Sequence, residues 1–278
     1  MLRTIAAARR FRRTAPGPVV LVPTMGALHR GHAALIDRAR KLAGPRGTVI
    51  VTIFVNPAQF GPREDLSRYP RPFADDRRLA GEHGADAIFH PAAAEMYRAD
   101  FSTWVDEERV SLPLCGASRP GHFRGVCTVV LKLFNVTQPD LAVFGRKDFQ
   151  QCAVIGRMVR DLDLPIRLVL AETVREPDGL ALSSRNTYLS AEERAQAPII
   201  RQAFLDAKDA WRAGETRAAV LRRQVARQIE TASLARIDYI ELVDARTLEP
   251  VKQAGPGTVL AGAVFFGGTR LIDNLWLA

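Results

Sequence analysis

Cysteine is scarce in this chain of 278 residues, and its three cysteines, Cys115, Cys127 and Cys152, form no CxxC pair. An odd, scattered set excludes a disulfide-stapled secreted scaffold, provides no zinc-binding pattern and favours a reducing compartment. Long apolar runs are missing too: the longest, at residues 48–55, falls far short of the roughly 18 residues that span a membrane. The 20 glycines follow no period, which excludes a collagen-like chain. We therefore expect a cytoplasmic protein without a metal site of its own.

The composition that remains is that of a globular protein. Hydrophobic residues make up 47% of the chain and charged residues 25%, too apolar for a chain that is mainly disordered. A single hydrophobic core is near its practical size limit at this length, so we expect one large domain and a smaller one.

Positive charge is concentrated in the first part of the chain. Residues 1–173 carry 25 Lys and Arg against 17 Asp and Glu, whereas residues 174–278 carry 14 against 13. Such an excess attracts a polyanion, either a nucleotide or a nucleic acid, and a general solubility role is the alternative. The Arg-rich residues 1–17 lack the apolar core of a signal peptide. We expect an amphipathic first helix there, with a transit peptide as the alternative.

Apolar, β-branched runs alternate with stretches of helical periodicity in the first part. The pattern predicts strands at 18–24, 48–56, 86–91, 140–145 and 166–170, and helices at 32–43, 74–83, 125–138 and 148–160. Continuously apolar strands are typical of a parallel sheet covered by helices on both faces. The order predicts an α/β fold with a Rossmann-like, doubly wound parallel sheet, whose ligands bind beyond the carboxyl ends of the strands.

The pattern changes after residue 173. A polar loop with Gly and Pro is predicted at 172–190 and is followed by predicted helices at 191–213 and 216–232. Predicted strands follow at 237–244, 258–267 and 269–277. Helices followed by strands indicate a small α+β domain. We therefore predict a nucleotide-binding catalytic domain at 1–173 and a C-terminal α+β lid domain at 174–278.

The segment VPTMGALHRGH, residues 22–32, lies where the first predicted strand leads into the first predicted helix of the sheet. His29 and His32 are three residues apart and share one face of a helix start, while Gly26 and Gly31 allow a phosphate to approach the backbone. Two imidazoles donating hydrogen bonds there would stabilise charge that develops on an α-phosphate. A polar, solvent-facing turn is the alternative.

Neutral amides follow the second predicted strand. In FVNPAQF, residues 54–60, Asn56 and Gln59 could bind a hydroxyl or a carboxylate without adding charge. Taken alone, this segment is better explained as a proline turn with amide caps.

Two further segments carry phosphate-binding side chains. In FGRKDFQQ, residues 144–151, Gly145 allows a tight turn, Lys147 can reach a phosphate and Asp148 can cap the next helix. In LSSRN, residues 182–186, two hydroxyls and a guanidinium suit a pyrophosphate leaving group, although a surface loop would have the same composition. A mobile loop with these groups could close over ATP.

Together these segments resemble the pantothenate synthetase (pantoate–β-alanine ligase) family, an HxGH branch of the class I synthetase-like nucleotidyl-transfer superfamily. The matching blocks lie within residues 23–190: PTMGALHRGH, TIFVNPAQFGPREDLSRYPR, GHFRGVCTVVLKLFNVTQPDLAVFGRKDFQQ and REPDGLALSSRNTYLS. The resemblance implies that ATP, (R)-pantoate and β-alanine give pantothenate, AMP and pyrophosphate through a pantoyl adenylate. It also implies a homodimer and magnesium bound mainly through the ATP phosphates.

The resemblance implies a set of site residues as well. For ATP they are Met25, Gly26, Ala27, Leu28, His29, Arg30, Gly31, His32, Gly145, Arg146, Lys147, Asp148, Val174, Leu182, Ser183, Ser184 and Arg185. Gln59 and Gln151 would bind pantoate, with Gln59 also near β-alanine. The catalytic residues would be His32 as proton donor, His29, Lys147 and Arg185.

Some positions have no assigned role. Arg146 stands where the resemblance leads us to expect Glu or Gln. His122 lies in a matching block, and we expect it to make a hydrogen bond that fixes a loop. Asp75 and Asp76 could assist a metal ion. Because neighbours on a helix point apart, we expect them to be solvated.

Three alternatives remain. A nucleotidylyltransferase of the same superfamily would leave AMP on its acceptor, and HxGH alone does not separate it from a ligase. A basic nucleic-acid-binding module would need aromatic residues between its charges, and aromatics are only 7% of the chain. An inactive relative is the third, although every predicted phosphate-binding position holds a suitable residue.

Overall fold

The computed structural model describes residues 1–62 and 64–278 and divides them into two compact units. The first comprises Met1–Glu108, Arg119–Arg146 and Val154–Glu172. The second comprises Arg109–Ser118, Lys147–Ala153 and Thr173–Ala278. Two short segments from the first part of the sequence thus belong to the second unit.

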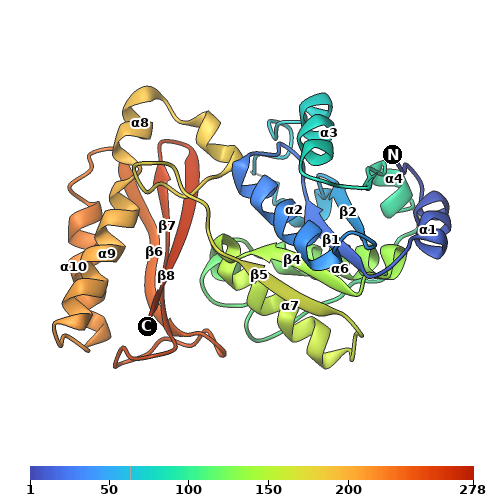
Figure 1. Cartoon of the computed structure of the whole chain (residues 1–278). Helices are drawn as coiled ribbons and strands as arrows, with labels where there is room; N and C mark the ends of the chain where they lie inside the picture. Colours follow the sequence, from blue (N-terminus) through green and yellow to red (C-terminus); the bar gives the residue numbers. More distant parts are fainter. Residues whose placement is uncertain (63) are drawn as a thin grey trace. The chain divides into compact units, whose positions relative to one another are not determined.

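A five-stranded parallel sheet forms the centre of the first unit (Figure 1). Its strand order is β3-β2-β1-β4-β5, with β1 at Val19–Thr24, β2 at Thr48–Ile53, β3 at Ala87–Phe89, β4 at Leu141–Gly145 and β5 at Arg167–Ala171. All six residues of β2 and the first four of β1 are buried, because helices cover both faces of the sheet. The edge strand β5 is half-buried or exposed, so the prediction of a strand covered on both faces is wrong there.

Helices of the first unit follow the predicted alternation with strands. They are α1 (Ile5–Thr14), α2 (Arg30–Ala43), α3 (Phe73–Glu82), α4 (Ala93–Met96), α6 (His122–Thr137) and the larger part of α7 (Phe149–Asp161), with a 3₁₀ turn η1 at Pro57–Gln59. Helix α2 buries the stripe Ala33, Ile36, Ala39 and Ala43 against β1, β2 and β4. In Figure 1, α2 and α6 lie on opposite faces of the sheet.

The topology identifies where chemistry is expected. From β1 the chain proceeds to β2 and β3 on one side, and it later adds β4 and β5 on the other side. The strand order therefore reverses between β1 and β4, which is the switch point where open α/β sheets bind ligands. The HxGH segment follows β1, and β4 ends at Gly145, so that Arg146–Asp148 follow β4.

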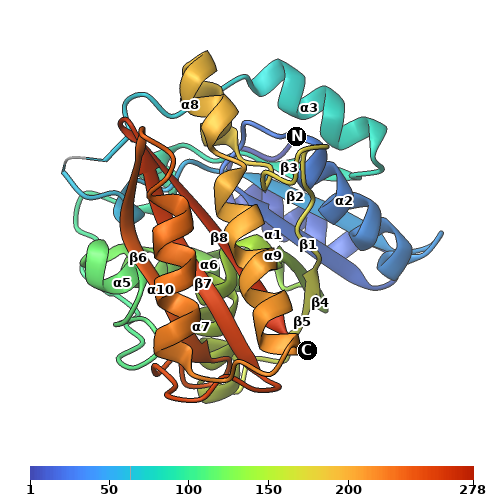
Figure 2. The same cartoon turned by 90° about the vertical axis from the view of Figure 1, so that its left-hand side faces the viewer.

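The second unit is built on an antiparallel sheet, β6-β7-β8, of Ala235–Asp244, Thr258–Phe266 and Thr269–Leu277. Its other elements are α5 (Cys115–Ser118), η2 (Arg146–Asp148, the first residue of which belongs to the other unit), η3 (Ser184–Tyr188), α8 (Ala191–Gln196), α9 (Ile199–Arg212) and α10 (Ala218–Ile229). Figure 2 shows α9 and α10 side by side against one face of this sheet. The predicted class, a doubly wound parallel sheet with a smaller α+β part, is confirmed.

The predicted single helix at 191–213 is wrong, because the structure has two helices there. Helix α8 ends at Gln196 and α9 begins at Ile199. Pro198 lies between them, and proline has no backbone N–H with which to continue the helical hydrogen bonds.

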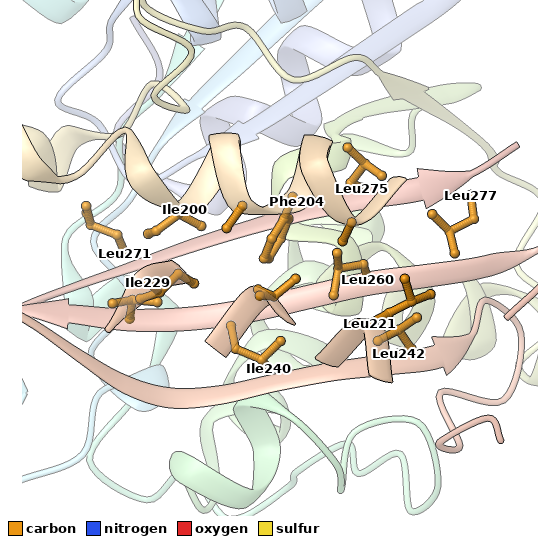
Figure 3. Close-up of a cluster of buried hydrophobic side chains, with 14 of the residues drawn as sticks. Ile200, Phe204, Leu221, Ile229, Ile240, Leu242, Leu260, Leu271, Leu275 and Leu277 are labelled. Atoms are coloured by element: carbon orange, nitrogen blue, oxygen red, sulfur yellow. The ribbon is translucent and has the colours of Figure 1, made fainter. Parts of the chain in front are cut away.

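Large apolar side chains fill the space between α9, α10 and the sheet (Figure 3). Phe204 of α9 is fully buried, and a Cβ at Gly262 of β7 would lie 2.9 Å from its Cζ atom. The glycine therefore allows the ring to approach the strand backbone. On β8, Leu271, Leu275 and Leu277 belong to this core.

Candidate active site

The turn between β1 and α2 holds two successive residues in the left-handed region. Gly26 has φ 88° and Ala27 has φ 50°. A Cβ at Gly26 would lie 2.9 Å from Oδ2 of Asp76 and 3.1 Å from Cγ2 of Ile53, so only glycine fits this position. The sequence motif thus forms a tight, strained turn that leads directly into the helix.

His29 and His32 cap the first turn of α2 through the same ring atom. Nδ1 of His29 accepts a hydrogen bond from the backbone N–H of Gly31 at 3.1 Å, and Nδ1 of His32 accepts one from the backbone N–H of His29 at 3.3 Å. A backbone N–H only donates, so neither Nδ1 atom carries a proton, and each neutral ring has its proton on Nε2. The ring centroids are 4.2 Å apart. Both imidazoles are therefore oriented as Nε2–H donors at the helix N-terminus.

Asp76 of α3 binds the backbone of this turn. Its Oδ2 accepts the N–H of Ala27 at 2.9 Å, and its Oδ1 accepts the N–H of Leu28 at 2.6 Å. Asp76 is 1% exposed. Burial raises the pKa of its carboxyl above the usual value, and the two backbone hydrogen bonds offset only part of this effect. The prediction that both adjacent acids are solvated is therefore wrong for Asp76 and holds for Asp75, whose side chain is 75% exposed. Neighbours on a helix do point apart, and here one of them points at the turn.

Gln59 ends the 3₁₀ turn after β2, and its side-chain amide has a fixed orientation. Its Oε1 accepts a hydrogen bond from Nδ2 of Asn56 at 3.1 Å, and its Nε2 lies 2.9 Å from Sδ of Met25. Tyr97 donates its hydroxyl proton to Oδ1 of Asn56 at 2.8 Å. Burial raises the pKa of Tyr97, so the hydroxyl stays a donor. The structure thus brings Gln59 and Met25 together and directs the Gln59 N–H groups toward the HxGH turn.

The backbone of Gln59 is held from a second side. Its carbonyl oxygen lies 2.8 Å from Nδ1 of His122 and 3.3 Å from Nη2 of Arg119. Arg119 also forms an ion pair with Glu64. Burial raises the pKa of the Glu64 carboxyl, but the hydrogen bond and the charge of Arg119 outweigh burial and hold this pKa below its usual value. The loop-fixing hydrogen bond predicted for His122 is confirmed.

Helix α6 approaches this 3₁₀ turn at Gly125. The carbonyl oxygen of Gly125 accepts a hydrogen bond from Nδ2 of Asn56 at 3.0 Å. A Cβ at Gly125 would lie 2.2 Å from the carbonyl oxygen of Ala58. A glycine in the middle of a helical pattern is therefore explained by the close contact of two backbones.

The segment after β4 divides between the two units. Gly145 and Arg146 belong to the first, and Arg146 pairs with Glu172 at 2.8 Å, which accounts for the arginine at this position. Lys147, Asp148 and Gln151 belong to the second. Cap formation by Asp148 and the substrate contact of Gln151 stay predictions.

Gln150, beside Gln151, has a structural role that the sequence did not reveal. Its Oε1 accepts the N–H of Cys115 at 2.9 Å, and its Nε2 donates to the carbonyl oxygens of Val110 and Pro113 at 3.0 and 2.6 Å. These bonds attach the 109–118 segment to the start of α7.

The predicted loop at 172–190 is more ordered than its composition suggests. The N–H of Leu182 donates to the carbonyl oxygen of Val174 at 3.0 Å, which closes a short antiparallel turn. Ser183 then caps the 3₁₀ helix η3, and its side chain accepts the N–H of Arg185 at 3.2 Å. Val174 and Leu182–Arg185 are thus connected by hydrogen bonds, and they belong to the same unit as Lys147 and Asp148.

Neither a metal cluster nor a membrane helix is found in the part of the chain that the structure describes. Across residues 1–62 and 64–278, no group of three or more His, Cys, Asp or Glu side chains is arranged to hold a metal ion. Among the helices of those same residues, none has the length and hydropathy needed to cross a membrane.

Comparison with known proteins gives consistent matches over the whole chain. The family model of pantoate-beta-alanine ligase matches residues 1–276. A pantothenate synthetase of Moorella thermoacetica is 51% identical over 280 residues, covering 100% of this chain and 98% of the relative. One of Akkermansia muciniphila is 53% identical over 259 residues, covering 93% and 92%.

Solved structures agree. The crystal structure of pantothenate synthetase from Thermus thermophilus has a TM-score of 0.93 and 44% identity, covering 99% of this chain and 98% of that one. The pantoate-beta-alanine ligase of Francisella tularensis, complexed with beta-gamma ATP and beta-alanine, has a TM-score of 0.81 and 30% identity, covering 100% and 98%. With a parallel sheet, an HxGH turn at its switch point and these matches from end to end, the chain belongs to the pantoate–β-alanine ligase family.

Proposed function

We propose that this ligase condenses (R)-pantoate with β-alanine to give pantothenate, using ATP and releasing AMP and pyrophosphate through a pantoyl adenylate. The observation that carries the proposal is the HxGH turn at the carboxyl end of β1, where His29 and His32 present Nε2–H donors and the Gln59 amide lies against Met25. Hydrogen-bond donors for a nucleotide and a neutral amide for the acid substrate thus lie together at the switch point, as an adenylating enzyme requires.

ATP is assigned to the residues that match the family pattern: Met25–His32, Gly145–Asp148, Val174 and Leu182–Arg185. The backbone of the HxGH turn and the N-terminus of α2 suit the phosphates, because free N–H groups and the helix dipole favour negative charge. Lys147 and residues 183–185 add hydrogen-bond donors, which are the charged groups of Lys147 and Arg185 and the hydroxyls of the two serines.

In the first step, a carboxylate oxygen of pantoate attacks the α-phosphorus of ATP. The new bond joins that oxygen to phosphorus, and the bond from phosphorus to the pyrophosphate oxygen breaks. His29 and His32 stabilise charge on the phosphate oxygens by donating Nε2–H hydrogen bonds, and His32 stands at the position that the family pattern assigns as the proton donor. Lys147 and Arg185 stabilise the leaving pyrophosphate.

Pantoate is assigned to the amides of Gln59 and Gln151. A neutral amide holds a hydroxy acid without pairing with its carboxylate, whereas an arginine clamp would make that carboxylate less nucleophilic. Asn56 donates to Oε1 of Gln59, and one Nε2–H of Gln59 is directed at Sδ of Met25. The amide therefore offers its second N–H group to the substrate.

In the second step, the β-alanine amine attacks the carbonyl carbon of the mixed anhydride. The new bond joins nitrogen to that carbon, the bond from the carbon to the phosphate oxygen of AMP breaks, and the proton lost by the amine passes to solvent as AMP leaves. This transfer needs no covalent enzyme intermediate, so no side chain is assigned as a nucleophile. Magnesium would be bound mainly through the ATP phosphates and would neutralise their charge. Asp76 is not assigned to the metal, because both of its carboxylate oxygens accept backbone N–H groups.

The family resemblance also supports a cytoplasmic homodimer that binds small molecules and no nucleic acid, with residues 174–278 acting as a lid. Sedimentation of the purified protein tests the dimer directly.

Product analysis tests the proposed function against the nucleotidylyltransferase alternative. After incubation with ATP, pantoate and β-alanine, we expect AMP, pyrophosphate and pantothenate in equal amounts. A product that retains AMP, with only pyrophosphate released, would support the alternative. Omission of β-alanine is the control, because it should abolish pantothenate and sustained AMP release.

A further inference from the structure

The last strand, β8, contacts two of the segments assigned to ATP, and it does so with opposite faces. Leu271 and Leu275 point into the core beneath α9 and α10 (Figure 3). Side chains alternate along a strand, so Asp273 shares that face and Asn274 lies on the other. Asp273 and Asn274 are 5% and 7% exposed. Two buried polar residues therefore stand side by side in a strand that has no sequence motif.

Asn274 binds the backbone of Lys147. Its Nδ2 donates a hydrogen bond to the Lys147 carbonyl oxygen at 3.0 Å. Two residues further along each segment, the rings of Trp276 and Phe149 meet edge to face, with centroids 5.8 Å apart. The lysine side chain is long and flexible, so the position of its ammonium group depends on where its backbone is fixed. Asn274 thus fixes the backbone position from which the Lys147 side chain extends.

Asp273 binds the segment that leads to the Ser183–Arg185 donors. Its two carboxylate oxygens accept hydrogen bonds from Arg175 at 2.6 and 2.9 Å, and the paired side chains are 4% and 19% exposed. Arg175 also donates to the carbonyl oxygen of Gly179 at 3.0 Å, within the turn closed by Val174 and Leu182. Asp273 thus holds the turn from which the donor segment emerges.

Asp273 and Asn274 are also joined by a hydrogen bond. Oδ1 of Asp273 also accepts the backbone N–H of Asn274 at 2.8 Å. A shift of either residue therefore moves the other, and with it both attached segments.

We propose that Asp273 and Asn274 are positioning residues for adenylation: through β8 they hold Lys147 and the 174–185 segment in one fixed arrangement around the ATP phosphates. The proposal rests on the proposed function. It gives the C-terminal sheet a role in binding ATP, because two separate phosphate-binding segments are attached to one of its strands. Neither residue touches ATP in this scheme, so both act through the groups that they hold.

The test replaces Asn274 by Asp, which keeps the shape and removes the donor, and by Ala, which avoids the added charge. We expect the Kd for a non-hydrolysable ATP analogue, measured by calorimetry, to rise at least about fivefold, the scale of one lost hydrogen bond. The Kd for pantoate should stay at its wild-type value. Asn135→Asp, at an exposed position of α6, is the matched control for charge and should bind both ligands normally.

The outcomes separate the two proposals. If folded Asn274→Ala binds the ATP analogue with wild-type affinity, or loses affinity for pantoate and the analogue equally, the positioning role is wrong. If Asn274→Asp does not fold, Asn274→Ala alone decides. Should the wild-type protein make no pantothenate, the proposed function fails, whereas the analogue measurement still decides the role of Asn274.

Discussion

Replacing Asp76 by Asn should weaken ATP binding without altering any group that contacts the nucleotide. In the wild-type protein both carboxylate oxygens accept backbone N–H groups, from Ala27 at 2.9 Å and Leu28 at 2.6 Å. An amide has one acceptor oxygen, so the variant keeps one of these bonds and turns an NH₂ group toward the other N–H. The change therefore removes one charge-assisted hydrogen bond at a buried position.

The conformation of Ala27 sets the size of the effect. An alanine at φ 50° lies in the left-handed region, which costs about 1–2 kcal/mol for a residue with a Cβ. A hydrogen bond to a charged group contributes about 1.5–3 kcal/mol. The bond to Asp76 is thus just large enough to hold Ala27 in this conformation, and its loss allows the turn to relax. We expect the free energy of unfolding to fall by about 1–3 kcal/mol and the Kd for ATP to rise about tenfold.

Urea unfolding and calorimetric ATP binding measure both effects, and the neighbouring acid is the matched control. Asp75→Asn makes the same chemical change at a side chain that is 75% exposed, so it should lie within about 0.5 kcal/mol of wild type. Adding Ala27→Gly to Asp76→Asn should restore part of the ATP affinity, because glycine adopts this φ without strain. Equal ATP binding by the Asp75 and Asp76 variants would show that Asp76 does not hold the turn in its ATP-binding conformation. Full recovery of Asp76→Asn at high magnesium would instead indicate a metal-binding role.

Three further substitutions test the surroundings of the pantoate site and its pH response. Gly125→Ala should destabilise the protein by about 1–3 kcal/mol in urea, because its Cβ would lie 2.2 Å from the Ala58 carbonyl oxygen. Tyr97→Phe, which removes the donor to Asn56, should raise KM for pantoate about fivefold and leave KM for ATP unchanged in steady-state assays. The ion pair of Glu64 stabilises the folded state above the unfolded carboxyl pKa, near 4.5, and is lost as the pH falls through the lower folded pKa. Glu64→Gln should therefore lose less stability than wild type when urea unfolding is compared between about pH 5 and pH 3.

Local patterns in the sequence were sufficient for the order of the strands and of most helices, but they missed the short helices α4 and α5. The apolar, β-branched run at 48–56 contains β2, because a strand covered on both faces needs such residues along its whole length. The helix predicted at 191–213 is wrong in one respect, since an apolar stripe continues through Pro198 while the backbone hydrogen bonds do not.

The supports of the site could not be predicted from local patterns. Asp75 and Asp76 are equivalent in the sequence, and only the packing of α3 decides which of them meets the HxGH turn. Asn274 is 127 residues from Lys147, in a strand whose pattern indicates only burial. Motifs report groups that face a ligand, whereas the residues that hold those groups are determined by the tertiary fold.

The exchange of labelled pyrophosphate into ATP, with pantoate present and β-alanine absent, measures formation of the pantoyl adenylate directly. A pantoyl adenylate formed reversibly on the enzyme predicts exchange that requires pantoate and that falls at least about 100-fold in His32→Ala, the scale of losing one transition-state donor. If no exchange occurs with pantoate, and no AMP appears when β-alanine is added, the chain does not form the adenylate and is not an active pantoate–β-alanine ligase.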